Sequence, residues 1–177
     1  MKKALQLLIL FMMLFPIASW SQTIPVSIPG TRISFSFPKD SWVFLKAITP
    51  DKNTTIYNYG YIKDYVVDSV GDTIIPTARV YVKKNYTGTL FDFAYNTYMT
   101  EPFQSLNEYS NELSFGESIG YLGAYKNTFD GKDYEIRMIF FKDKNTAIEI
   151  RLEATVDNYA DFEEQFQSII ESITIKK

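Results

Sequence analysis

The feature that most restricts the fold of this chain is one apolar stripe near its C-terminal end, in the segment DNYADFEEQFQSIIESI (157–173). Apolar side chains recur there at helical spacing, and acidic residues crowd the first turns, where a helix dipole stabilises negative charge. The apolar positions are Tyr159, Phe162, Phe166, Ile169, Ile170 and Ile173. The pattern predicts an amphipathic helix, capped by Asp157 or Asn158, that buries this stripe against the rest of the protein.

Segments of alternating polarity provide the surface on which such a helix packs. In TRISFSFP, Ile33, Phe35 and Phe37 alternate with serines, which is the period of a half-buried strand. Strands are predicted at 33–37, 42–48, 55–62, 78–82, 113–119, 121–129, 134–141 and 147–154, with a short edge strand in SITIKK at the end. A hairpin turn is predicted at 68–72, because Gly and Asp tolerate the backbone angles of tight turns.

A second helix is predicted in TLFDFAYNTYMTEPF (89–103). Thr89 and Asp92 have the spacing of a capping box, and Leu90, Phe93 and Ala94 begin a stripe that ends at Pro102. The chain is therefore predicted to be α+β, with an antiparallel sheet flanked by helices in an αβα sandwich.

The N-terminal segment MKKALQLLILFMMLFPIASWSQ has the order of a secretory signal peptide: positive, apolar, then small residues. We expect cleavage near Ser21/Gln22, an exported periplasmic or secreted product, and one domain over 22–177. The apolar run is too short for a membrane span, which needs about 20 residues, and we expect no transmembrane segment in the mature chain. Without Lys2 and Lys3 the chain has 16 basic and 21 acidic residues, a net charge of −5. Such a balance does not favour nucleic acid as a partner.

The chain contains no Cys and no His. Their absence excludes disulfides, Ser-His-Asp and Cys-His catalysis, and zinc sites of the usual kind. We therefore expect no catalytic residue, no metal site and no cofactor, and we expect that the protein is not an enzyme. Its hydrophobic core has to provide the stability that disulfides often give to exported proteins.

An aromatic stripe in TIYNYGYIKDY (55–65) is a candidate ligand face. Tyr57, Tyr59 and Tyr61 recur at every second position and therefore share one face of a strand. Tyrosine offers a flat ring with a polar tip, which suits carbohydrate or small-ligand binding. The other interpretation, which we favour, is core packing beneath a helix, and burial of the three side chains distinguishes the two.

Charged residues alternate with apolar ones on the predicted strands 134–141 and 147–154. We expect a register that sets Arg137 near Glu149 and Glu135 near Arg151, because opposite charges across a strand pair are stabilising. A solvated sheet face is the favoured interpretation of this group. The alternative is a hydrolase that uses carboxylates alone, drawn from Glu135, Glu149 and Glu153. At 68–72 a solvated turn is likewise favoured over a calcium loop, since the spacing matches no EF-hand.

The order of these elements resembles the Mog1/PsbP-like superfamily. The resemblance spans about residues 31–175 and depends on SFSFP, Trp42, the tyrosine strand, a hairpin, the LFDFAYNTY helix, a meander, and the final Y-x-x-F-x-x-x-F-x-x-I-I-x-S-I helix. It implies a sheet sandwiched by helices. The superfamily includes photosystem subunits, a nuclear-transport factor and many small exported bacterial proteins, mostly accessory proteins or adaptors, and no functional residue transfers to this chain.

The resemblance therefore implies a non-enzymatic binding or accessory module that contacts a protein or envelope component, with its oligomeric state open. The tripeptides that begin at Asp68 and Asp72 are similar to O-glycan acceptors of some Gram-negative envelope proteins, which makes Ser69 and Thr73 candidate acceptors.

Overall fold

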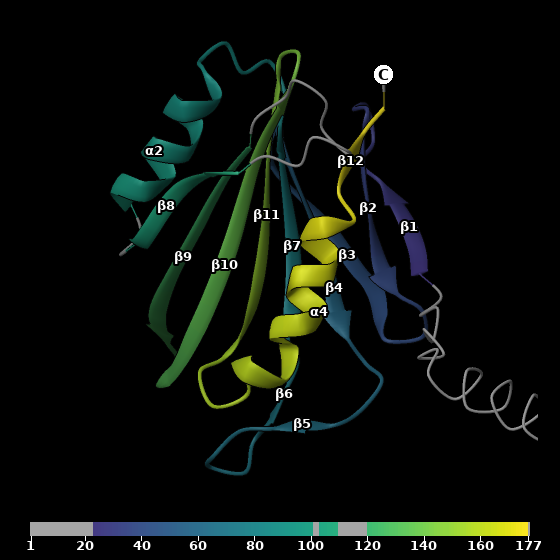
Figure 1. Cartoon of the computed structure of the whole chain (residues 1–177), viewed down its shortest axis with the longest axis vertical. Helices are drawn as coiled ribbons and strands as arrows, with labels where there is room; N and C mark the ends of the chain where they lie inside the picture. Colours follow the sequence, from purple (N-terminus) through teal and green to yellow (C-terminus); the bar gives the residue numbers. More distant parts are fainter. Residues whose placement is uncertain (1–22, 101–102, 110–119, 177) are drawn as a thin grey trace, which may run out of the picture.

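A seven-stranded antiparallel sheet, in the order β3-β4-β7-β11-β10-β9-β8, forms the centre of the computed structural model (Figure 1). The structure describes residues 23–100, 103–109 and 120–176. The strands of this sheet are β3 (Trp42–Asp51), β4 (Thr54–Tyr61), β7 (Thr77–Lys83), β8 (Phe103–Tyr109), β9 (Gly120–Phe129), β10 (Lys132–Asp143) and β11 (Thr146–Thr155). Helices and a smaller sheet pack on its two faces, so the predicted α+β class is confirmed.

One face, which we call the inner face, is covered by helix α4 (Tyr159–Glu171) and by a three-stranded sheet in the order β1-β2-β12 (Figure 1). The strands of this small sheet are β1 (Thr23–Ser27), β2 (Ile33–Pro38) and β12 (Thr174–Ile175). The predicted stripes meet here, since Phe35 and Phe37 of β2 and Phe162 and Phe166 of α4 are all buried in one core cluster. The short terminal strand is confirmed as well, and it pairs with β2.

The opposite face, which we call the outer face, is covered by a helix only in part. Helix α2 (Leu90–Thr100) packs on β9 and β10, where Ala94, Tyr125 and Met138 form a second core cluster. The predicted capping box is present: the Asp92 backbone N–H donates to Thr89 Oγ1 at 3.0 Å, and the Thr89 backbone N–H donates to Asp92 Oδ2 at 2.9 Å. No described helix covers the outer face of β3 and β4 (Figure 1).

The predicted hairpin forms a separate two-stranded sheet, β5 (Val66–Val67) with β6 (Thr73–Ile74), below the large sheet (Figure 1). Lys132 donates to the carboxylates of Asp68 and Asp72, which fastens the hairpin to the start of β10. Asn158 is the N-cap residue of α4 but makes no capping hydrogen bond with its side chain; its amide donates to the Val67 carbonyl at 3.1 Å. The residue predicted to cap the helix therefore holds the hairpin.

Two expectations about the strands were wrong. In the observed register, Arg137 pairs with Leu152 and Glu135 with Ala154, so both charged residues lie on the inner face, away from Glu149 and Arg151. Strand β8 was not predicted, because its apolar residues recur at every third position across a register shift.

The strand predicted at 113–119 and the signal peptide at 1–21 lie outside the described residues. Within the described residues no helix has the length and apolar character needed to cross a membrane.

Candidate interaction surface

The tyrosine stripe of β4 points to the inner face. Tyr61 is 8% exposed, and its ring centroid lies 4.8 Å from that of Phe162 on α4. Tyr59 is half-buried, with its ring centroid 5.0 Å from that of Phe37, and Tyr57 also packs against the core cluster of the inner face. Burial raises the pKa of both Tyr59 and Tyr61, which keeps their hydroxyl groups neutral. The stripe is thus part of a packed face, and a ligand role for it stays a prediction.

The other side of β4 lies on the outer face and meets the neighbouring strands around Gly60. Val43 of β3 and Thr77 of β7 pair with Gly60 from either side. A Cβ atom at Gly60 would lie 3.0 Å from both Leu45 Cδ1 and Ile75 Cγ2, so both side chains lie close against the glycine. The missing side chain at Gly60 lets aliphatic groups from two separate segments approach its backbone closely.

Four aliphatic side chains around this point, together with a fifth farther along β3 opposite Ile56, form what we call the outer apolar surface. Its members are Val43, Leu45, Ile48, Ile62 and Ile75, each between 36 and 55% exposed. Isolated exposed apolar residues are ordinary in proteins, but a contiguous group on an uncovered sheet face marks an interaction site. This group is the strongest candidate site in the described part of the chain.

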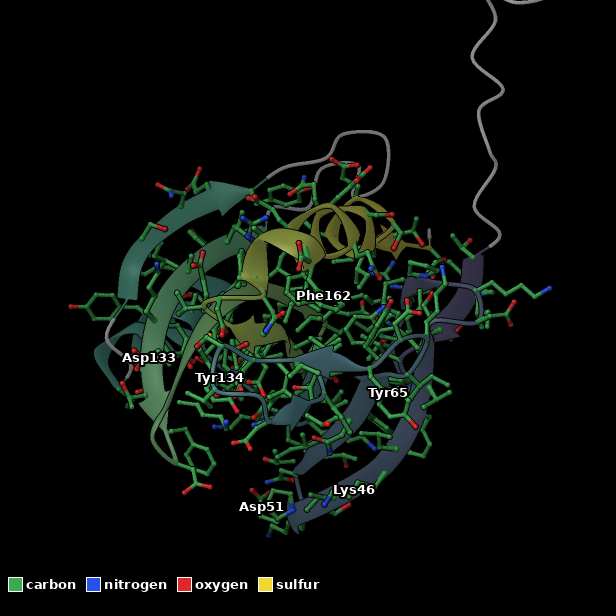
Figure 2. All side chains as sticks on the ribbon, turned by 90° about the horizontal axis from the view of Figure 1, so that it is seen from below. Lys46, Asp51, Tyr65, Asp133, Tyr134 and Phe162 are labelled. Atoms are coloured by element: carbon green, nitrogen blue, oxygen red, sulfur yellow. The ribbon has the colours of Figure 1, made fainter. Side chains whose placement is uncertain are left out.

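A groove of about 290 Å³ adjoins the outer apolar surface. Its walls come from the end of β4, the segment that follows it and strand β6. The lining residues are Tyr61, Ile62, Lys63, Asp64, Tyr65, Thr73, Ile74 and Ile75. Tyr65 is 92% exposed and lies at the margin of the molecule near this segment (Figure 2). Because Ile62 and Ile75 belong to both features, the groove and the outer apolar surface form one continuous apolar area.

Two lysines flank this area without an ion pair among the described residues. Lys46 pairs with Asn58 on the outer face and lies on the side of the sheet away from α4 (Figure 2). Lys63 lines the groove. The acidic residues nearest to them in sequence accept hydrogen bonds from neutral donors: Asp51 accepts the backbone N–H groups of Asn53 and Thr54, which lowers its pKa, and Asp64 accepts the Tyr61 hydroxyl at 3.0 Å. Asp64 also lines the groove beside Lys63, so the rim of the apolar area carries charges of both signs.

The charged centre of the sheet is buried, and the expected solvated face was wrong there. The side chains of Glu149 and Arg151 are only 6 and 14% exposed, and Arg151 Nε donates to Glu149 Oε1 at 2.9 Å. The guanidinium also lies over the rings of Tyr81 and Tyr125, at 5.3 and 5.9 Å from their centroids. Burial alone would lower the pKa of Arg151, but Glu149 together with the Tyr125 and Tyr81 side chains raises it above its usual value.

The three carboxylates of the hydrolase alternative are not brought together. Glu149 pairs with Arg151, Glu153 pairs with Arg79, and Glu135 lies on the inner face with Lys126 at 3.3 Å. Each is neutralised by a cation, which is the opposite of a pair whose pKa values are split for acid and base roles. In residues 23–100, 103–109 and 120–176 no three acidic residues are grouped closely enough to hold a metal ion.

Ser69 and Thr73, the candidate glycan acceptors, lie exposed on the β5–β6 hairpin. The backbone N–H of Ser69 donates to Asp157, and a cleft of about 330 Å³ lies between this turn, Lys132 and Asp157. Hydrogen bonds from Thr155 and Ser69 lower the pKa of Asp157 to about 2. The acceptor role of the two hydroxyl groups stays a prediction.

The geometry above is that of a PsbP-like fold, and comparison with solved structures agrees. No protein-family profile matches the sequence, and neither does any curated protein. The fold is similar to that of the cyanobacterial PsbP, CyanoP, from Synechocystis sp. PCC 6803, with a TM-score of 0.60, 10% identity, and 91% of this chain and 96% of that chain covered. These values confirm the predicted Mog1/PsbP-like architecture, at the level of fold alone.

Two further structures share the architecture. LpqN, which is involved in cell envelope biogenesis of Mycobacterium tuberculosis, matches with a TM-score of 0.55 and 16% identity over 92% of this chain and 98% of that one. A Pseudomonas aeruginosa protein of unknown function matches with a TM-score of 0.50 and 8% identity over 88% of this chain and 99% of that one.

Sequence reasoning did not identify the outer apolar surface. The one available signal was the segment WVFLKAI, which is apolar on both faces of the strand that it forms. Trp42 is buried on the inner face, whereas Val43 and Leu45 are exposed. A strand that is apolar on both faces is typical of a sheet centre, so only the topology, which puts β3 at the edge, shows that one face is left uncovered.

Proposed function

We propose that this chain is an exported, non-enzymatic accessory module that binds a protein or an envelope component through the outer apolar surface. The observation that carries the proposal is the grouping of four half-exposed aliphatic side chains around Gly60, with Ile48 farther along β3, next to a groove and on a sheet face that no described helix covers. Burial of each such side chain in an interface contributes on the order of 1 kcal/mol.

The partner contacts the face of β3 rather than its edge. Edge strands invite pairing with another chain, and proteins commonly block it with bulges, Lys and Pro. Strand β3 has all three. Its register with β4 shifts between Phe44 and Lys46 and again between Ile48 and Asp51, it contains Lys46, and Pro50 has no backbone N–H to donate to a partner strand. Addition of a partner strand is thereby disfavoured, and the apolar face remains.

Export is the second part of the proposal. It is supported by the signal-peptide pattern of residues 1–21, with cleavage near Ser21/Gln22. The likeness in fold to LpqN, a protein involved in cell envelope biogenesis, points in the same direction. The proposed binding would therefore take place in the periplasm or outside the cell.

Binding of a carbohydrate or small ligand to the tyrosine stripe is less favoured. Tyr61 is buried, and Tyr57 and Tyr59 pack against the core, so a flat sugar ring would reach only the rims of these side chains. A hydrolase is less favoured still, because Glu149 and Glu153 are paired with arginines.

Affinity capture from an envelope extract tests the proposal with three matched proteins: the wild type, the double variant Leu45→Ser/Ile75→Ser, and the control Phe129→Ser. Phe129 is exposed at the β9–β10 turn and contributes nothing to the outer apolar surface. We expect the wild type and the control to recover the same specific partner and the double variant to lose it. Equal recovery by the double variant, or substrate turnover by the purified chain, would contradict the proposal.

A further inference from the structure

We propose that the protein bound by the outer apolar surface is a second copy of this chain. In the resulting dimer, the exposed ridge of helix α2, formed by Phe91, Asp92 and Tyr95, lies on the outer apolar surface of the other copy, and the reciprocal contact forms at the same time. This inference deepens the proposed function and rests on it, because it names the partner of the same surface.

The ridge of α2 presents aromatic side chains to solvent. Phe91 and Tyr95 are half-exposed, and their rings are stacked with centroids 5.6 Å apart. Phe91 also meets the ring of Tyr121 on β9 edge-on, with centroids 5.8 Å apart, so neighbouring aromatic rings hold it in place without a partner. Aromatic anchors carry much of the energy of protein interfaces. The stacked pair is therefore a second candidate contact, next to the outer apolar surface, on the outer face of the sheet.

The ridge and the outer apolar surface complement each other in shape. Helix α2 adds a layer over β9 and β10, whereas β3 and β4, at the other side of the same face, carry no described helix (Figure 1). A helix is about 10 Å across, which is also the usual thickness of one layer packed on a sheet. The α2 helix of a second copy would supply the missing layer, and the groove of about 290 Å³ beside Ile62 and Ile75 has room for one aromatic ring.

One two-fold axis is sufficient to make both contacts. The ridge and the outer apolar surface lie on the same face of the same sheet, so rotation about an axis between them and parallel to that face sets each opposite its counterpart. Interfaces of this isologous kind are the commonest in homo-oligomers, because every contact is made twice. An unrelated protein would need two separate features to cover the ridge and the outer apolar surface.

The size of the contact favours this arrangement over other ways of pairing two copies. The five aliphatic side chains of the outer apolar surface, Phe91 and Tyr95 are each 36 to 55% exposed. Together they offer on the order of 600 Å² per copy, since a large apolar side chain presents about 150 to 250 Å² in full. Two copies would then bury about 1,200 Å², the lower limit of specific interfaces, whereas two outer apolar surfaces packed on each other would bury only about 800 Å².

The charges agree with a second copy. Asp92 lies on the ridge and stays ionised, because its hydrogen bonds with Thr89 lower its pKa. Lys46 lies on the outer face of β3, so the ridge and the strand that it would cover carry opposite charges. The groove contains both Lys63 and Asp64 and favours neither sign. Anionic lipid is less favoured, because its recognition generally uses about four to eight clustered basic residues.

Sedimentation of the purified protein over about 1 to 100 μM, a range that suits an interface of this size, provides the first test. The wild type is compared with the surface variant Leu45→Ser/Ile75→Ser, the ridge variant Phe91→Ser/Tyr95→Ser and the control Phe129→Ser. We expect the wild type and the control to form a dimer, and the surface and ridge variants each to weaken it at least about tenfold. A dimer that the folded ridge variant retains would overturn the inference. Circular dichroism shows that each variant is folded before it is compared.

Thiol cross-linking tests which surfaces meet, since the chain contains no native cysteine. One protein carries Leu45→Cys, a second carries Tyr95→Cys, and the control carries Phe129→Cys. With a short bismaleimide, the mixture of the first two should give a covalent dimer, and Leu45→Cys should give much less of it alone or with the control. A Leu45→Cys protein that reacts with itself or with the control as well as with Tyr95→Cys would overturn the proposed arrangement.

Capture from the envelope extract separates this inference from the proposed function. If the inference is correct, the protein that the wild type recovers is the chain itself. If the purified protein is a monomer at every concentration and capture still depends on Leu45 and Ile75, the inference is wrong and the surface binds a different protein. Vesicles of phosphatidylcholine and phosphatidylglycerol that bind the wild type but not the surface variant would replace the second copy with a lipid surface.

Discussion

Arg32 and Asp143 join the small sheet to the large one through three hydrogen bonds to a single carboxylate. Arg32 Nη2 and Nε donate to Asp143 Oδ1 at 2.8 and 3.0 Å, and the Arg32 backbone N–H donates to Oδ2 at 2.7 Å. Asp143, at the end of β10, is buried, whereas Arg32, just before β2, is half exposed. Burial alone would raise the pKa of Asp143, but the bonds from Arg32 lower it below its usual range.

The substitution Asp143→Asn should therefore destabilise the protein by about 2 to 4 kcal/mol, since it removes a buried charge that three donors satisfy. Urea unfolding followed by circular dichroism measures the change. Asp130→Asn is the matched control, because Asp130 is an exposed turn residue with φ of 51°, a conformation that Asn tolerates. Equal stability of the two variants would mean that Arg32 and Asp143 do not fasten the sheets.

Acid should loosen the β5–β6 hairpin first. Hydrogen bonds from Thr155 and Ser69 lower the pKa of Asp157 from its usual value of 3.8 to about 2. A hydrogen bond from Lys132 likewise lowers the pKa of Asp68. A carboxyl group with a lowered folded-state pKa contributes stability above its unfolded pKa, and this contribution is lost as the pH falls through the folded value. Stability should therefore decline between pH 4 and pH 2.

Amide hydrogen exchange of the hairpin, compared with that of β10, measures this loosening. In Asp157→Asn the exchange of the hairpin amides should already be faster at neutral pH and should change less between pH 4 and pH 2 than in the wild type. The exchange of β10 serves as the internal control, because its central residues are buried. A hairpin that stays as protected at pH 2 as at neutral pH would show that the two carboxylates do not hold it.

Local patterns were sufficient to predict most of the elements. The alternation of Phe35 and Phe37, the capping box at Thr89 and the stripe of α4 each reflect contacts within one segment or burial of one face, which a sequence displays directly. Strand β8 was not predicted because its bulge at Phe103/Ser105 breaks the alternation of apolar and polar residues that marks a strand.

Features that depend on tertiary arrangement were not predictable in the same way. Charge pairing suggested that Arg137 lies near Glu149, but the observed register differs from this by an odd number of residues and therefore reverses the face. The two-residue turn at Lys144 and Asn145, with Lys144 at φ of 53°, fixes that register. The outer apolar surface escaped for a related reason, because a sequence does not show which strand lies at the edge of the sheet.

The buried pair of Glu149 and Arg151 should behave as a unit. Glu149→Gln leaves the Arg151 guanidinium without its carboxylate in a buried setting, and we expect a loss of about 3 to 5 kcal/mol. The double variant Glu149→Gln/Arg151→Met should lose clearly less than the sum of the two single variants, since no uncompensated charge remains. A double-mutant cycle from urea unfolding measures the coupling, and additive losses would show that the two side chains act independently.

Phe166 should be the most costly position at which to shorten a side chain on α4. It is fully buried, and its ring lies 5.6 Å from that of Tyr159 and 6.2 Å from that of Trp42. Phe166→Ala should lose about 3 to 5 kcal/mol through the transferred area and the cavity that remains, whereas Phe166→Leu should lose about 1 to 2 kcal/mol. The control Tyr65→Ala, whose side chain is almost fully exposed after β4, should change stability by less than about 0.5 kcal/mol. Trp42 fluorescence follows the unfolding of all three variants, and a Phe166→Ala variant as stable as the control would mean that α4 does not contribute to the core as the structure indicates.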